Sequence, residues 1–155
     1  MNGGSDLIKQ ILVCLDGEEH SQKAQEYAIF LAGAVNARIT ALHVENPYLK
    51  QFHHEIYATG RREYVAYVDD MLQDQCAEIL TYFGKQAQVK DLKYNTKSRH
   101  GVPLEEIVGE TQDNYYDIVV VGGKRLRGLE KYKSGNLPEK LQKVLDVPLL
   151  TVKIQ

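Results

Sequence analysis

The sequence predicts an α/β fold, an open and doubly wound sheet of five parallel strands. Short apolar runs alternate along the chain with segments of helical periodicity, which is typical of parallel strands joined by right-handed crossovers. The run at residues 118–121 is continuously apolar, so we expect it to be buried on both faces. A length of 155 residues suits one domain, residues 1–155, with a substantial core.

The first third of the chain predicts a strand, a helix and a second strand. The apolar segment 8–15 ends at Asp16-Gly17, a turn signal, and residues 38–45 form a second apolar run. Between them, Ser21 is expected to cap a helix that ends at Val35. The predicted inner face of this helix carries Ala24, Tyr27, Ala28, Leu31 and Val35.

The remaining elements follow the same alternation, after a short helix of unreadable bounds within 49–57. A helix over 61–86 is predicted by a stripe formed by Val65, Val68, Leu72, Cys76, Ile79 and Phe83. Weaker alternation over 89–98 suits a half-exposed edge strand. The last predicted elements are a helix starting at 101–103, a strand at 117–122, a helix at 137–145 and a strand at 148–154.

Composition and charge exclude several classes of protein. Apolar residues make up 43% of the chain and charged residues 26%, with a net charge of -2, so no global charge attracts nucleic acid. No apolar run approaches the roughly 18–20 residues needed to cross a bilayer, so we expect no membrane insertion. No signal-peptide pattern opens the chain, and Cys14 and Cys76 suit buried, reduced thiols. A cytoplasmic protein is expected.

The segment from Asp117 to Lys140 is the most informative part of the chain. Its apolar run is expected to stop at Gly122-Gly123, and a basic loop follows. Asn136 is a good helix N-cap, and Glu139 occupies the capping-box position. Helix N-termini favour anions, so the segment predicts an anion site.

The predicted sheet also indicates where a ligand would bind. Parallel sheets bind ligands at the carboxyl ends of their strands, where strand order reverses. This rule brings Asp16, Val44 and Gly122 around one crevice.

Other motifs are missing or isolated. No G-x-G-x-x-G follows the first strand, no G-x-x-x-x-G-K-[ST] occurs, and no Ser/His/Asp spacing suggests a hydrolase. His53-His54-Glu55 has no second matched cluster, so we expect no metal site. No robust enzyme activity and no catalytic residue are expected, although slow ATP hydrolysis stays open.

Three segments resemble the universal stress protein family, and the resemblance covers nearly the whole chain. They are residues 11–21, the stretch Ala41-Leu-His-Val44, and residues 101–107 leading into the glycine segment. The resemblance implies a Rossmann-like, adenine-nucleotide alpha-hydrolase-like sheet of order 3-2-1-4-5. It also implies a nucleotide site formed by Asp16, Val44, Gly122, Arg125, Gly135, Asn136 and Leu137.

The glycine motif of this chain departs from the family pattern. ATP-binding members carry G-x-x-G-x(9)-G-[ST], which falls here on Gly122, Arg125, Gly135 and Asn136. Asn136 keeps an N-cap without the hydroxyl group. Arg125 adds bulk where a glycine would let the backbone approach phosphate, but it also adds N–H donors.

Two functions therefore stay open. The first is a regulatory domain that acts through an unidentified protein partner and whose nucleotide site is degenerate, as Arg125 suggests. The alternative is a stress sensor that binds ATP or another adenine nucleotide, as the spacing of Gly122 and Gly135 and the Asn136 cap suggest. The resemblance also implies a homodimer joined through the C-terminal strand, whose short apolar edge suits pairing with another chain.

Overall fold

The computed structural model of this chain describes residues 7–48, 61–124 and 136–154. The helix expected within 49–57, the His53-His54-Glu55 cluster, Arg125 and Gly135 all lie outside the described residues. The elements follow in the order β1 (Gln10–Cys14), α1 (Glu19–Val35), β2 (Arg38–Glu45), α2 (Arg61–Val89), β3 (Tyr94–His100), α3 (Pro103–Asp113), β4 (Ile118–Lys124), α4 (Leu137–Val144) and β5 (Leu149–Ile154).

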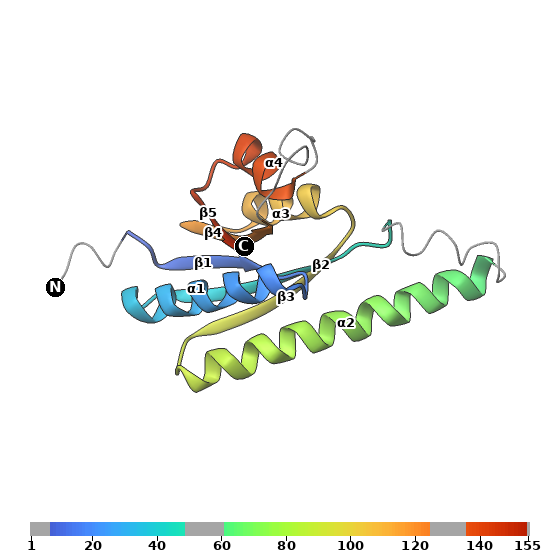
Figure 1. Cartoon of the computed structure of the whole chain (residues 1–155), viewed down its shortest axis with the longest axis horizontal. Helices are drawn as coiled ribbons and strands as arrows, with labels where there is room; N and C mark the ends of the chain where they lie inside the picture. Colours follow the sequence, from blue (N-terminus) through green and yellow to red (C-terminus); the bar gives the residue numbers. More distant parts are fainter. Residues whose placement is uncertain (1–6, 49–60, 125–135, 155) are drawn as a thin grey trace.

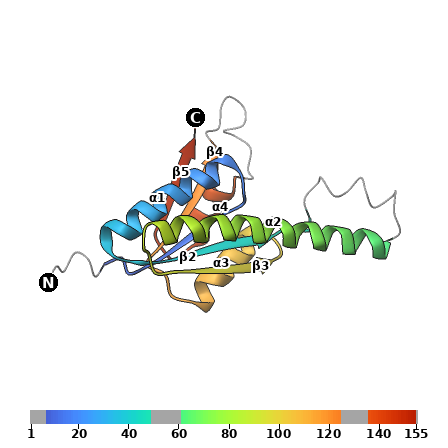
Figure 2. The same ribbon diagram turned by 90° about the horizontal axis from the view of Figure 1, so that it is seen from below.

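The five strands form one parallel sheet of order β3-β2-β1-β4-β5, which confirms the predicted fold class and strand order. Helices α1 and α2 cover one face, and α3 and α4 cover the other (Figures 1 and 2). The first turns of α2 extend past the end of the sheet in both views. Among the described helices, none combines the length and the apolar character needed to cross a bilayer.

The core has two layers because side chains alternate across the central strands. Ile11 and Val13 of β1 face α1 and α2, whereas Leu12 faces α3 and α4. The prediction that β4 is buried on both faces is confirmed, since Val119, Val120 and Val121 are each at most 2% exposed. Both cysteines are free thiols, and burial raises the pKa of each.

The two predicted helix faces were confirmed except at one residue each: Ala24 and Ala28 of α1 and Val68, Leu72, Cys76 and Phe83 of α2 are buried, and Leu31, Val35 and Ile79 pack against the core. The buried stripe of α1 runs through Ala24, Gln25, Ala28 and Ile29, which leaves Tyr27 52% exposed. In α2, Tyr64 is buried and Val65 is 49% exposed. A shift of one residue rotates a helix position by about 100°, so the apolar pattern alone did not fix which side chain faces inward.

Some predicted element ends were also wrong. Helix α1 begins at Glu19, so Ser21 is not its cap but a buried residue of its first turn. Helix α2 continues to Val89, and β3 starts at Tyr94 after Asp91 takes a left-handed φ of 55°. Strand β4 does not stop at the glycines: Gly122 and Gly123 pair with Val152 and Lys153 in β5.

Candidate functional site

A cavity of about 650 Å³ opens at the carboxyl ends of β1 and β2. This volume lies within the roughly 300–1,000 Å³ typical of small-molecule sites. Asp16 and Val44 both line it, as predicted, and the start of α1 and the middle of α2 supply further walls. We call this cavity the crevice.

Asp16 organises the turn that leaves β1. One carboxylate oxygen accepts the backbone N–H of Glu18 at 2.8 Å, and the other lies 3.0 Å from Nε2 of His20. The backbone N–H of Asp16 donates to the buried hydroxyl of Ser21 at 2.9 Å. Such local side-chain bonds are what aspartate supplies in turns. The side chain is still 54% exposed, so the carboxylate also faces the crevice and solvent.

The main-chain N–H and C=O of Val44 lie at the crevice. The main-chain groups of even-numbered β2 residues bond on the β1 side: the N–H of Arg38 donates to Lys9, and the C=O of Leu42 accepts from Leu15. Those of odd-numbered residues bond on the β3 side, as Ile39 does to Lys93 and Glu45 to Gly101. Residues of a strand alternate in this way, so the N–H and C=O of Val44 point towards β1. The paired register of β1 ends at Cys14, opposite Leu42. The two polar groups of Val44 therefore face the space beyond the end of β1.

His43 lies in the crevice wall. Its side chain is 5% exposed, and Nδ1 lies 2.7 Å from the carbonyl oxygen of Leu15. Because a carbonyl only accepts hydrogen bonds, Nδ1 carries the hydrogen. The Leu15 carbonyl is thus satisfied by a side chain where β1 ends.

A polar cluster borders the crevice at the start of α1. Asp16, Glu18 and His20 each bring a ligand-type atom within 4.8 Å of the others, a spacing that could hold a metal ion. His20 lies 3.4 Å from Glu18, and Glu18 also pairs with Lys124 at 3.3 Å. His20 Nε2 is 3.0 Å from Asp16 and Glu18 is paired with Lys124, whereas His20 Nδ1 makes no hydrogen bond to any described residue, and we assign no metal to this cluster.

Gly122 packs against the protein itself. A Cβ atom added there would lie 2.8 Å from the backbone N of Ser21 and would also collide with the carbonyl oxygen of His20. The missing side chain lets β4 approach the first turn of α1. Gly122 is not among the crevice-lining residues, although the backbone that it touches forms part of the crevice wall.

Asn136 and Leu137 begin α4, as predicted. Asn136 occupies the N-cap position, and its carbonyl accepts the N–H of Lys140 at 3.1 Å, but its side chain makes no capping bond. Leu137 packs on the core layer beside α3. Neither residue lines the crevice. Asp16 and Val44 therefore lie together in the crevice, whereas the start of α4 lies outside it.

Sequence reasoning missed His43 and Gln25 as crevice residues. The position of His43 beside the crevice could have been inferred, because it directly precedes Val44 at the end of β2. Gln25 is 5% exposed yet polar, and only the observed rotation of α1 shows that it turns inward.

Comparisons with known proteins agree with the fold. Residues 7–153 match the model of the universal stress protein family. A universal stress protein of Methanocaldococcus jannaschii is 28% identical over 155 residues, covering 99% of this chain and 86% of that protein. A family protein from Arabidopsis thaliana, solved with AMP bound, is 18% identical with a TM-score of 0.67, covering 95% of this chain and 92% of that one. A universal stress protein solved in complex with cAMP is 17% identical with a TM-score of 0.59, covering 96% and 98%.

Proposed function

We propose that this chain, which belongs to the universal stress protein family, is a small regulatory domain that binds an adenine nucleotide in the crevice. The observation that carries the proposal is the main chain of Val44, whose N–H and C=O face the crevice beyond the end of β1. An adenine edge presents an amino donor beside a ring-nitrogen acceptor, which matches one residue's C=O and N–H. Two structural neighbours solved with AMP and with cAMP support the same class of ligand.

The rest of the crevice suits the sugar. The partly exposed carboxylate of Asp16 can accept hydrogen bonds from ribose hydroxyls, a role that acidic residues play after the strands of other nucleotide-binding sheets. Outside the crevice-lining residues, the N-terminus of α4, with an N-cap side chain that makes no capping bond, would favour phosphate charge. We propose nucleotide-dependent regulation of a protein partner, with no enzymatic step.

Nucleotide carried through purification would test this function. Denaturing the protein and analysing the supernatant by mass spectrometry should release an adenine nucleotide. Calorimetric titration should then give tighter binding of AMP than of GMP by roughly tenfold or more, because a guanine edge reverses the donor and acceptor. Equal affinities for AMP and GMP, or no binding of either at millimolar concentration, would contradict the proposal.

Asp16 should contribute to affinity through its charge and not only through its turn. Asp16→Asn retains an oxygen for the Glu18 N–H, whereas Asp16→Ala loses this bond. We expect Asn to weaken AMP binding by about fivefold, corresponding to roughly 1 kcal/mol, without changing stability. Alanine should weaken AMP binding and also lower the free energy of unfolding. If calorimetry shows native affinity for Asp16→Asn, the carboxylate does not contact the nucleotide.

The second candidate function is a partner-binding module without nucleotide, and Arg125 is the observation that favours it. This residue, outside the described part of the chain, replaces a glycine of the ATP-binding pattern. We expect its bulk to outweigh its charge, since phosphate sites of this kind depend on close approach of backbone amides and exposed arginines pair weakly in water.

Arg125→Gly is therefore expected to bind ATP more tightly than the native chain, by about tenfold or 1.4 kcal/mol in calorimetry. Arg127→Gly, in the same basic loop but off the glycine pattern, is the matched control for lost positive charge. Clearly weaker binding in Arg125→Gly alone would make Arg125 a phosphate ligand and would exclude the second candidate.

We also propose that the protein forms a homodimer through β5. This strand is the last in the sheet and pairs with β4 on one side only. The carbonyl of Pro148 accepts the N–H of Val119. The main-chain N–H and C=O groups of even-numbered β5 residues therefore point towards β4, and those of odd-numbered residues point towards the free edge. The N–H of Val152 points towards β4, whereas Thr151 presents its N–H to the free edge.

Thr151→Pro should therefore give a monomer mass by light scattering at micromolar concentration, against a dimer mass for the native chain. Val152→Pro is the contrasting variant: it removes a bond within the sheet and should destabilise the fold. A native protein that already has the monomer mass would contradict the proposal.

A further inference from the structure

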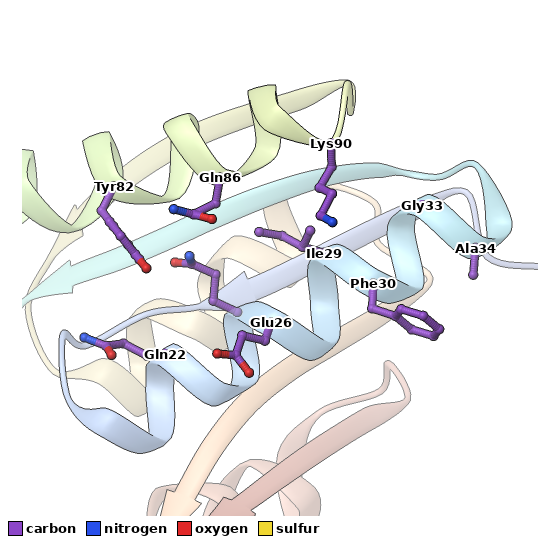
Figure 3. Close-up of a pocket in the computed structure, with 10 residues that line it drawn as sticks. Gln22, Glu26, Ile29, Phe30, Gly33, Ala34, Tyr82, Gln86 and Lys90 are labelled. Atoms are coloured by element: carbon purple, nitrogen blue, oxygen red, sulfur yellow. The ribbon is translucent and has the colours of Figure 1, made fainter.

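A second cavity lies between α1 and α2, on the same side of the sheet as the crevice. Its volume is about 520 Å³, and we call it the α1–α2 groove, lined by Gln22, Gln25, Ile29, Gly33, Tyr82 and Lys90 among others. Tyr82 and Gln86 of α2, and Lys90 just after its end, project towards α1 (Figure 3). Ile29 supplies an apolar floor that is only 8% exposed. Gln22, Gln25 and Tyr82 also line the crevice, so the two cavities share a wall.

Gln25 is the residue that indicates a ligand. Its side chain is 5% exposed and lines the groove, and within the described part of the chain it makes no hydrogen bond. A buried amide without a protein partner gains stability from a molecule that can hydrogen-bond to it. Its amide atoms are not fully enclosed by protein, since His20 Nδ1 is the one fully buried unpartnered side-chain atom among the described residues. The amide is therefore available to a molecule in the groove.

Lys90 supplies a charge at the opposite end. No ion pair joins it to any other described residue, whereas the acidic groove residue Glu26 is paired with Lys23 at 3.1 Å. Lys90 directly follows Val89, the last residue of α2, and its side chain points towards α1 above Ile29 (Figure 3). Gln25 and Gly33, which both line the groove from α1, are eight residues apart, which is about 12 Å along a helix at 1.5 Å per residue. The groove thus has a neutral polar end, an apolar floor and a cationic end.

We propose that the α1–α2 groove binds a straight-chain monocarboxylate with a hydrogen-bonding group at its far end. The carboxylate would pair with Lys90, the chain would cover Ile29 and Gly33, and the far group would bond to the Gln25 amide. A separation of about 12 Å corresponds to a chain of roughly ten carbons. The inference stands on these residues and does not depend on nucleotide binding in the crevice.

Titration with 10-hydroxydecanoate, followed by amide chemical shifts without nucleotide, tests the groove. We expect saturable binding, with decanoate roughly three- to tenfold weaker because it lacks the hydroxyl group. Gln25→Leu should bring both probes to the affinity of decanoate. Lys90→Met should weaken both, by roughly tenfold.

Gly33 gives a matched pair of variants on the groove floor. A Cβ atom at Gly33 would meet only Leu92, at 3.9 Å, so Gly33→Ala should fold and bind as the native chain does. Gly33→Leu should fill the groove and abolish binding of both probes. Equal binding of the two probes by the native chain would overturn the proposal. So would unchanged binding in Lys90→Met, a surface substitution that leaves the fold intact.

Discussion

Replacing Gly122 with alanine is expected to lower the free energy of unfolding by about 3 kcal/mol, at the upper end of the range for overpacked sites. The added Cβ would strike main-chain atoms of His20 and Ser21, which cannot move aside as a flexible side chain can. The first turn of α1 would have to shift away from β4. Since domains are stable by only about 5–15 kcal/mol, urea denaturation would detect this change readily.

Gly123→Ala is the matched control in the same strand. Its Cβ would meet side-chain atoms, Cγ of Pro138 at 3.2 Å and Cγ2 of Thr151 at 3.4 Å. Both can yield slightly, so a loss of about 1 kcal/mol is expected. Equal losses for Gly122→Ala and Gly123→Ala would show that close approach of α1 is not what requires a glycine at 122.

The second large effect is expected at Glu110, a carboxylate on α3 that is 2% exposed. Four side chains donate to it: Tyr116 at 2.6 Å, Lys97 at 2.9 Å, Asn114 at 3.0 Å and Arg99 at 3.2 Å. Lys97 and Arg99 belong to the edge strand β3, so the carboxylate of Glu110 links α3 to β3. Hydrogen bonds to charged groups contribute about 1.5–3 kcal/mol each, and Glu110→Gln should lower the free energy of unfolding by about 2–3 kcal/mol.

Glu110 should also make the free energy of unfolding depend on pH. Burial acts to raise the pKa of Glu110, but hydrogen bonds from Tyr116, Lys97 and Arg99 outweigh it and hold the pKa below the ordinary 4.5. The folded protein therefore binds fewer protons than the unfolded chain in this window. The stabilisation is complete above about pH 4.5 and is lost as the pH falls through the lowered pKa of the folded state.

Urea denaturation between pH 3 and pH 7 checks this dependence. The acid loss of stability should be smaller in Glu110→Gln than in the native chain. Asp113→Asn is the control, because Asp113 contacts the same Arg99 at 3.3 Å but is 64% exposed, and exposed pairs contribute roughly 0–1 kcal/mol. If Glu110→Gln and the native chain lose the same amount of stability at low pH, Glu110 is not the source of the pH dependence.

The sequence predicted the sheet well because apolar runs and helical periods alternate clearly. Strand β2 was predicted at its observed bounds, and the resemblance supplied the strand order that the structure confirms. Helix rotations were less predictable. In α1 the buried stripe includes Ser21 and Gln25, polar residues whose inward position no apolar pattern reveals.

The candidate site was predicted in part, for physical reasons that differ between residues. Asp16 and Val44 were placed correctly because the carboxyl ends of adjacent parallel strands must meet. Gly122 was assigned to ligand approach, but its contacts are with α1, which depends on tertiary packing that the sequence does not display. The partners of Glu110 come from β3 and from the connection that follows α3, and the pairing with β3 does not follow from local spacing.

The most direct test of nucleotide binding in the crevice is an AMP titration of the isotope-labelled protein followed by amide resonances. We expect the Val44 N–H resonance to shift most strongly among the strand amides, because the base edge bonds to it, and we expect Gly17 and Glu18 to respond beside Asp16. Saturable AMP binding that leaves the Val44 amide unchanged would place the nucleotide elsewhere and contradict binding in the crevice.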